Sequence, residues 1–252
     1  MTQYDSCFYQ THSRGSSSSA AKVVPHLVSL LKPRSVVDVG CGIGTWLAEF
    51  LQQGVARVLG VDGAYVDKRQ LRIPVNTFVD WDLEAPLALE QRFDLAISME
   101  VAEHLSPGRA ASFVSDLTRL APVVVFSAAI PLQGGTNHIN EQWASYWSAL
   151  FEGQGFQAID CLRARFWNDS GVDFWYRQNM MLYSSGRMPD FPECDPKMPL
   201  DVVHPDLYCA TVTQPSLRYL LRNVPGALAR SFKRHVGINS SRCEKRQLAP
   251  NS

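Results

Sequence analysis

Three glycines at alternate positions follow a short apolar run near the start of the chain, and they limit its fold more than any other feature. Residues 36–39 (VVDV) lead directly into residues 40–44 (GCGIG). The apolar run indicates a buried strand, and glycines after it permit positive φ angles and close approach of a ligand to the backbone. In open α/β sheets, ligands bind in the crevice at such strand ends. The segment therefore predicts a strand, a ligand-binding turn and a helix that begins near Gly44.

Apolar, β-branched runs alternate with helical patterns along the first part of the chain. The predicted strands are 35–39, 57–61, 77–79, 93–98 and 123–126, and the predicted helices are 20–31, 46–53, 109–120 and 141–151. Strands that are apolar along their whole length are typical of a parallel sheet covered on both faces. Two later strands, 156–162 and 176–183, are expected to form an antiparallel pair. The expected fold class is α/β: a Rossmann-like, doubly wound, mostly parallel, seven-stranded sheet with an antiparallel edge hairpin.

Composition divides the chain into four parts. Residues 1–19 are polar and end in four serines, so we expect no packed element there but a lid over the ligand site. The predicted domain covers 20–186, and the proline-rich stretch 187–215 is typical of an extended connector. Within the basic tail, 216–252, residues 216–236 can form an amphipathic helix that makes peripheral contact with an anionic membrane. The alternatives are a helix docked on the domain and a solvated tail. Pro225-Gly226 interrupts the helical pattern and therefore favours these alternatives over a membrane-bound helix.

Charge and cysteine usage exclude several classes of protein. The chain has 24 basic and 24 acidic residues, and the tail carries +7 while the first 215 residues carry −7. DNA is therefore not expected as a partner, and RNA is not favoured as an acceptor. The six cysteines show no C-x-x-C spacing, which argues against a structural zinc site and a disulfide framework. With neither a secretory signal nor a membrane-length apolar run, a cytoplasmic location is expected.

Carboxylates follow the first three predicted strands. Asp38 precedes the glycines, and Asp62 ends the second strand, where a carboxylate can accept hydrogen bonds from ribose hydroxyls. Asp82 can accept a hydrogen bond from an adenine amino group, with Asp80 as the alternative. Over residues 20–185, this order and spacing resemble the class I S-adenosylmethionine (SAM)-dependent methyltransferases. The resemblance implies SAM as cofactor, held by Asp38, Gly40, Gly42, Gly44, Asp62, Asp82, Met99 and Glu100.

An acidic-histidine motif, EVAEH at residues 100–104, follows the fourth predicted strand. In a helical turn Glu100, Glu103 and His104 share one face, where two carboxylates and an imidazole need a compensating charge. A divalent cation (Mg, Mn, Fe or Zn) would supply it. The motif is similar to one in the ubiquinone-pathway O-methyltransferases and in enzymes that methylate the 2′-hydroxyl at small-RNA 3′ ends. The latter resemblance implies a later histidine as fourth ligand, here His138.

His138 lies in residues 134–143 (GGTNHINEQW), a signature that resembles a bacterial group of methyltransferases without a settled substrate. The sequence also allows metal-free interpretations. Glu103 could cap a helix, His104 or His138 could act as a general base, and His138 with Glu141 could order a loop. Further along, Arg177 or Gln178 could reach a ligand. The helical spacing of aromatic residues from 143 to 147 favours a core face over a stacking platform.

The predicted function is SAM-dependent methylation of a hydroxyl on a small-molecule or glycan acceptor. Glu103, His104 and His138 are the predicted catalytic residues, and a divalent metal would lower the pKa of the acceptor hydroxyl. A metal-free O- or N-methyltransferase is the first alternative. An NAD-dependent oxidoreductase is disfavoured because the G-x-G-x-x-G pattern is missing. A SAM-binding protein without catalysis is the last alternative.

Overall fold

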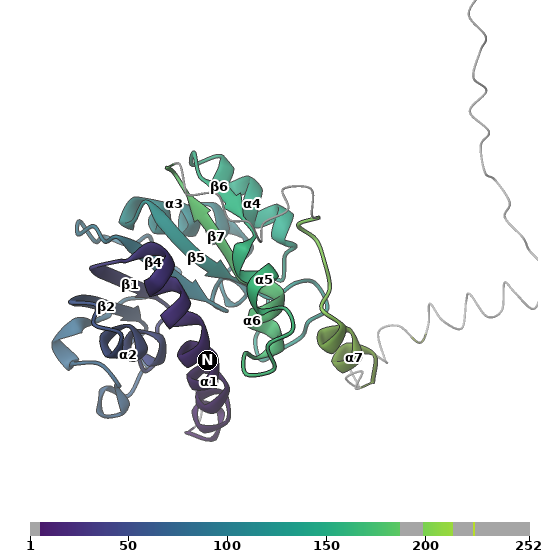
Figure 1. Cartoon of the computed structure of the whole chain (residues 1–252), viewed down its shortest axis with the longest axis horizontal. Helices are drawn as coiled ribbons and strands as arrows, with labels where there is room; N and C mark the ends of the chain where they lie inside the picture. Colours follow the sequence, from purple (N-terminus) through teal and green to yellow (C-terminus); the bar gives the residue numbers. More distant parts are fainter. Residues whose placement is uncertain (1–5, 187–198, 214–223, 225–252) are drawn as a thin grey trace, which may run out of the picture. The chain divides into compact units, whose positions relative to one another are not determined.

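A seven-stranded sheet forms the centre of the protein in the computed structural model, which describes residues 6–186, 199–213 and 224 (Figure 1). The strands are β1 Ser35–Val39, β2 Arg57–Asp62, β3 Phe78–Asp80, β4 Leu95–Met99, β5 Val123–Ser127, β6 Gln157–Ile159 and β7 Met181–Ser184. Their order is β3-β2-β1-β4-β5-β7-β6, with β1 to β5 parallel and β7 antiparallel to both β5 and β6. The predicted fold class, including the antiparallel edge pair, is confirmed.

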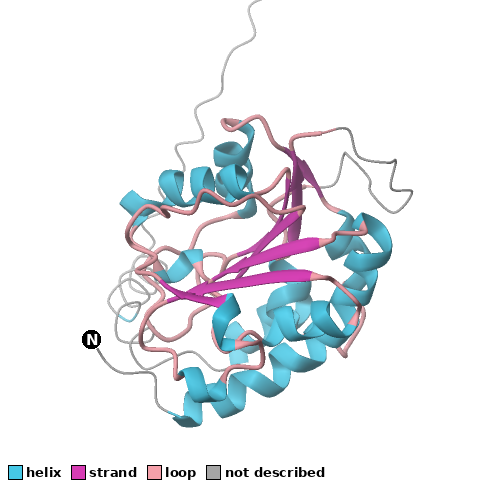
Figure 2. Ribbon diagram, turned by 90° about the vertical axis from the view of Figure 1, so that its left-hand side faces the viewer, coloured by secondary structure: helices cyan, strands magenta, loops and turns pink. Residues whose placement is uncertain are grey.

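Helices cover both faces of the sheet (Figure 2). They are α1 Ser6–Leu31, α2 Thr45–Gln52, α3 Ala110–Leu120, α4 Ala144–Glu152, α5 Cys161–Phe166, α6 Phe174–Asn179 and α7 Pro205–Thr213. Short 3₁₀ turns lie at Lys68–Gln70, Val75–Thr77, Ala102–His104 and Pro107–Arg109. Within the described part of the chain, every helix is too short or too polar to span a bilayer.

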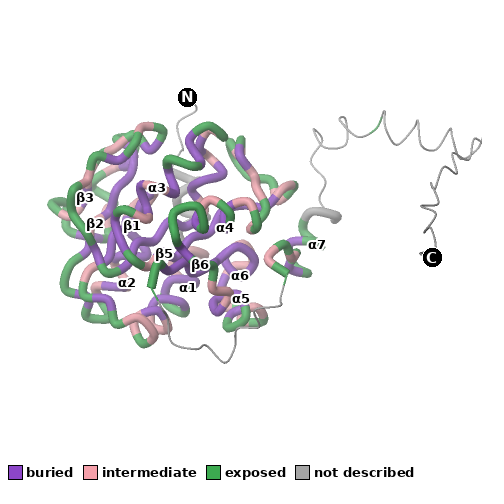
Figure 3. Tube along the Cα trace, turned by 90° about the horizontal axis from the view of Figure 1, so that it is seen from above, coloured by how far each residue is buried: buried purple, intermediate pink, exposed green. Residues whose placement is uncertain are grey.

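Successive residues of each strand enter different halves of the core. Val36 packs in the cluster that contains residues of α1 and α2, whereas Val37 packs in the cluster that contains Phe113 of α3 and Phe151 of α4. This alternation follows from the two-residue repeat of a strand. Because both faces of the central strands β1, β4, β5 and β7 are buried, these strands are largely apolar, and Figure 3 shows them mostly in the colour of buried residues.

The polar segment before residue 20 differs from its prediction, because α1 already begins at Ser6. Hydrogen bonds rather than apolar contacts attach its serine run to the domain. Ser19 is fully buried and accepts a bond from Asp173 N (3.0 Å), and Ser18 donates to Gly171 O (2.6 Å). Hydropathy alone does not detect this kind of support. The proposed lid function of residues 1–19 stays a prediction.

Two predicted strands are shorter than expected. β6 covers only Gln157–Ile159, because α5 begins at Cys161, and β7 begins at Met181 after the short helix α6. The last residues of α6, which precede β7, are polar yet buried. In a helix, successive side chains point in different directions, so each of these residues can reach a different partner. A strand would alternate them between the two apolar faces of the sheet.

The proline-rich stretch 187–215 also departs from its prediction in part. It contains α7, which starts at Pro205, a residue compatible with the first helical position. Asp206 of α7 accepts a bond from Arg177 Nη2 (2.7 Å). Residues 187–198 lie outside the described residues, as does the predicted basic helix at 216–236 except for position 224.

Two glycines with nearly the same backbone conformation provide a matched test of the glycine turn. Gly40 (φ 88°) would place a Cβ 2.3 Å from Val101 Cγ2, whereas a Cβ on Gly54 (φ 87°) would meet no described atom within 4 Å. Gly54→Ala should therefore cost only the left-handed strain of about 1–2 kcal/mol. Gly40→Ala should lose about 1–3 kcal/mol more through overpacking. Urea unfolding of both variants measures the difference, and equal losses would contradict the close packing at Gly40.

Candidate functional site

The glycine turn joins β1 to α2 through three left-handed residues. Gly40, Gly42 and Gly44 have φ values of 88°, 54° and 80°. Gly40 N donates to Val61 O (2.8 Å), which ties the turn to the end of β2. A Cβ on Gly42 would meet no described atom within 4 Å, so the backbone there is open to a ligand. The turn thus forms a cradle at the carboxyl end of the central strand.

Asp62 is buried at the end of β2 and holds this cradle. Its carboxylate accepts hydrogen bonds from Gly42 N (2.6 Å) and Gly63 N (2.7 Å), and the Tyr65 hydroxyl donates to it as well. Burial raises the pKa of Asp62 although these three bonds lower it. The position suits the predicted ribose contact. The Tyr65 hydroxyl binds Asp62 in the way that a ribose hydroxyl is expected to bind it. The sequence did not indicate Tyr65, whose side chain is largely exposed.

Asp38 is the least satisfied acid of the turn. It is 1% exposed, and neither carboxylate oxygen has a hydrogen-bond partner among the described residues. Burial raises the pKa of Asp38 well above its usual value, and the Asp62 carboxylate raises it further. Buried polar groups in native proteins are nearly always paired, so an unpaired carboxyl beside an open backbone turn marks a candidate ligand-binding position.

The other predicted cofactor residues lie along the same edge of the sheet. Asp82 is exposed and accepts a bond from Glu84 N (3.1 Å), while Asp80 pairs with Lys68 Nζ (2.6 Å). Met99 ends β4 and is buried. The adenine contact of Asp82 stays a prediction.

The structure brings together three of the four predicted metal ligands. Glu103, His104 and His138 each offer one ligand atom, and these atoms lie within 4.8 Å of one another. The two imidazole rings are nearly perpendicular, with centroids 4.8 Å apart. Backbone bonds hold the loop of His138 against the 3₁₀ turn, since Ile139 N and Asn140 N both donate to Glu103 O (2.9 and 3.0 Å).

This cluster contains buried ligand atoms without partners. Glu103 is completely buried, and neither carboxylate oxygen accepts a well-formed hydrogen bond from a described residue. Burial, with Glu100 nearby, raises the pKa of Glu103 well above its usual value. His104 Nδ1 is likewise buried and unpaired within the described structure, and burial together with His138 lowers the pKa of His104 to about 4. A divalent cation fits this donor set of one carboxylate and two imidazoles.

Glu141 orients His138. Its Oε1 lies 3.1 Å from His138 Nδ1 and accepts a bond from Gly134 N (2.7 Å), and its Oε2 accepts a bond from Leu132 N (2.8 Å). Partial burial works against ionisation, but these bonds lower the pKa of Glu141. A Cβ at Gly135 would lie 2.2 Å from His138 Nε2, so only glycine leaves room for the ring. Carboxylates commonly orient ligating histidines in this way. Sequence reasoning considered Glu141 only as a residue that orders the loop.

Glu100 lies beside this cluster but outside the three-residue group. Its φ of 56° is strained for a residue with a side chain, and such strain is found mainly at functional sites. Its carboxylate accepts bonds from Asn179 Nδ2 (3.1 Å) and Gln133 Nε2 (3.2 Å). Asn179 was missed in the sequence. The polar run that ends at it drew attention to Arg177 and Gln178, which instead bind the backbone oxygens of Trp167 and Val202.

The comparisons with known proteins agree with this geometry. A family model described as a methyltransferase domain matches residues 16–160. The chain is 39% identical over 94 residues to a tRNA U34 carboxymethyltransferase of Hydrogenovibrio crunogenus, which covers 33% of this chain and 28% of that protein. It is 38% identical over 87 residues to a ubiquinone biosynthesis O-methyltransferase of a Methylobacterium species, covering 32% and 33%. The chain thus spans a third or less of these relatives.

A solved structure has the same fold. The methyltransferase domain of bacterial CtHen1-C aligns with 68% of this chain and 100% of its own length, with a TM-score of 0.50 and 18% sequence identity. At this identity the likeness concerns the fold alone.

The two buried aspartates should have opposite effects on stability. Asp38→Ala removes an unpaired buried acid, so we expect the ligand-free protein to gain about 1–3 kcal/mol at neutral pH. Asp62→Ala strands the amide donors of Gly42 and Gly63 and should lose about 1–3 kcal/mol. Urea unfolding measures both changes.

The gain from Asp38→Ala should depend on pH. Because the folded pKa of Asp38 is raised, its ionised form destabilises the fold, and this cost begins above the unfolded pKa of about 3.9. The difference between wild type and variant should therefore be smallest below about pH 3.9 and should grow to its full size above the folded pKa. A gain that did not change with pH would contradict an electrostatic origin.

Proposed function

Because this chain belongs to the methyltransferase domain family, we propose that it is a class I SAM-dependent methyltransferase, which methylates a hydroxyl of a small-molecule or glycan acceptor with the help of a divalent cation. The observation that carries the proposal is the cluster of Glu103, His104 and His138, in which buried ligand atoms lack partners. Such a cluster next to the glycine turn gives the acceptor hydroxyl a place close to the methyl donor.

The glycine turn and its two carboxylates fit the parts of SAM. SAM supplies an electrophilic methyl group on a sulfonium. Asp38, with two unpaired oxygens, suits the ammonium group at the amino-acid end of the cofactor. Asp62 suits the ribose hydroxyls, one of which would replace the Tyr65 hydroxyl. The open backbone at Gly42 leaves room for the part of SAM that connects its amino-acid end to its ribose.

The carboxylate and the two imidazoles fit a divalent cation. Such a cation compensates the buried charge and lowers the pKa of a hydroxyl bound to it. In this proposal Glu103, His104 and His138 bind the cation, and Glu141 keeps the imidazole of His138 oriented. Glu100, which Asn179 and Gln133 hold beside the cluster, adds a second negative charge nearby.

Val101 packs against the glycine turn and lies two residues before Glu103 of the cluster. Its side chain leaves no room for a Cβ on Gly40. Methyl transfer needs the donor and acceptor in line and in contact, so this short path supports a role of the cluster in the reaction.

The proposed class of acceptor is supported by the net charge of this chain and not by the names of its relatives. The printed names of the relatives include both tRNA and ubiquinone biosynthesis, so they do not favour one class. The first 215 residues carry −7, which opposes binding to a polyanion and supports a small neutral acceptor.

Calorimetric titration of SAM, with metal analysis of the purified protein before and after chelation, tests the proposal. We expect SAM binding and near-stoichiometric divalent metal. Glu103→Gln and His138→Ala should lose the metal, and the exposed Glu152→Gln serves as the matched control. SAM binding without metal would leave a metal-free O- or N-methyltransferase, and absence of SAM binding would overturn the cofactor assignment.

Tyr65→Phe tests whether the ribose site is partly blocked in the free protein. The variant keeps the ring and removes the hydroxyl that donates to Asp62, so a ribose hydroxyl no longer has to displace it. We expect SAM to bind about threefold more tightly, as suits one exchanged hydrogen bond. Weaker binding would mean that the Tyr65 hydroxyl contacts the cofactor instead of competing with it.

A further inference from the structure

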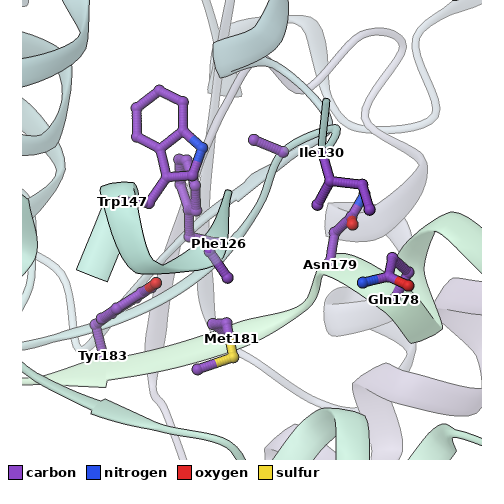
Figure 4. Close-up of a pocket in the computed structure, with 9 residues that line it drawn as sticks. Phe126, Ile130, Trp147, Gln178, Asn179, Met181 and Tyr183 are labelled. Atoms are coloured by element: carbon purple, nitrogen blue, oxygen red, sulfur yellow. The ribbon is translucent and has the colours of Figure 1, made fainter. Parts of the chain in front are cut away.

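A small cavity lies between α4, β5 and β7, and none of the functions discussed above accounts for it (Figure 4). Its volume is about 10 Å³, roughly the space that one water molecule needs. Most of the lining is apolar, including Phe126, Ile130 and Met181. The polar residues in this lining therefore decide what the cavity can hold.

Two unpaired polar atoms belong to residues that line this cavity. Trp147 is 2% exposed and Asn179 is 6% exposed. Neither the Trp147 indole nitrogen nor Asn179 Oδ1 has a hydrogen-bond partner in the described part of the chain. In Figure 4 the nitrogen-bearing edge of the Trp147 ring and the Asn179 side chain lie on opposite sides of the pocket. Leaving such groups buried and unpaired costs about 1–3 kcal/mol each, so one ligand that satisfies both is favoured.

The orientation of the Asn179 amide is determined by its other contacts. Asn179 Nδ2 donates to Glu100 Oε1 (3.1 Å) and to Gln133 Oε1 (3.0 Å), so the nitrogen faces these acceptors and Oδ1 is left to accept. The remaining polar lining groups are already paired, since the Tyr183 hydroxyl bonds with Ser148 and Gln178 donates to Val202 O. A ligand that satisfies both unpaired atoms accepts from an indole N–H and donates to an amide oxygen.

We propose that the cavity is a subsite for one hydroxyl-type oxygen, which accepts a hydrogen bond from Trp147 Nε1 and donates one to Asn179 Oδ1. A water molecule occupies it in the free protein. A hydroxyl of the methyl acceptor, distinct from the one that is methylated, replaces the water in the complex; this second statement rests on the proposed function. Water and an alcohol share the chemistry that the two atoms require.

The subsite would position the acceptor relative to the reactive cluster. Asn179 contacts the subsite through Oδ1 and Glu100 through Nδ2, and Glu100 lies beside Glu103. A second hydroxyl bound at the subsite would therefore position the acceptor by its hydrogen bond to Asn179, the side chain that also binds Glu100. Acceptors with two hydroxyl groups should be preferred over those with one.

The water is tested on the free protein. The indole N–H resonance of Trp147, assigned by its loss in Trp147→Phe, should show a cross peak to water, and a crystal structure should show one ordered water bridging the two atoms. A dry cavity would overturn the proposal. Trp143→Phe, a change at an exposed tryptophan beside the same helix, is the matched control and should leave the cross peak in place.

The alcohol is tested by NMR titration with ethylene glycol and with its dimethyl ether, which cannot donate a hydrogen bond. Ethylene glycol should shift the Trp147 indole and Asn179 amide resonances, and the ether should not. In Trp147→Phe, the glycol affinity read from the Asn179 amide should fall about fivefold, as expected for one lost hydrogen bond. Equal shifts with the ether would overturn hydroxyl recognition. If glycol causes no shift, the subsite holds water only and its role for the acceptor is overturned.

Parallel titration with SAM separates this proposal from the proposed function. SAM and metal binding with a dry cavity would remove the subsite and leave the methyltransferase proposal in place. A bridging water with no metal at Glu103 would support the subsite and remove the cation.

Discussion

The burial of four carboxyl groups at one edge of the sheet is the constraint on which the rest of the site depends. Asp38 and Asp62 lie at the ends of β1 and β2, and Glu100 and Glu103 follow β4. Burial raises the pKa of all four groups. Hydrogen bonds satisfy Asp62 and Glu100, but the oxygens of Asp38 and Glu103 have no partner among the described residues. Cationic or hydrogen-bond-donating ligands would stabilise the ionised form of such carboxyl groups.

The backbone around this edge is built to hold those groups close together. One carbonyl, Glu103 O, accepts two amide bonds from the loop that carries His138, which joins segments more than thirty residues apart. The missing side chain of Gly135 leaves room for the imidazole ring, and Glu141 holds its Nδ1 side. Glu100 keeps a strained left-handed conformation at the point where β4 ends. These local costs are tolerated because the parallel sheet and its helices determine the positions of both segments.

Neighbouring residues of α6 connect the site to a distant part of the chain. Gln178 binds the backbone of Val202 and His204, whereas Asn179 binds Glu100. The segment that contains Val202 is attached again where the Asp201 carboxylate accepts bonds from the amide and hydroxyl of Ser145 at the start of α4. The residues beside Glu100 are therefore supported by residues that follow the seven-stranded sheet in the chain.

The sequence by itself determined the fold class and the order of its parts. Strand periodicity, the glycine turn and the carboxylate after each early strand are local patterns, and local patterns can be read without a structure. It also named Glu100, Glu103, His104 and His138 as one group, because the resemblance linked two segments that hydropathy does not connect.

Only the tertiary structure decided which polar groups are satisfied. The pairing of Asp62 with Gly42, the separation of Glu100 from the three-residue cluster and the role of Asn179 depend on contacts between distant segments. The serine run of α1 and the helix α6 were misjudged for the same reason, since tertiary hydrogen bonds stabilise polar residues that hydropathy assigns to the surface. A buried polar group is acceptable or costly according to its partner, and the partner is known only when the chain is folded.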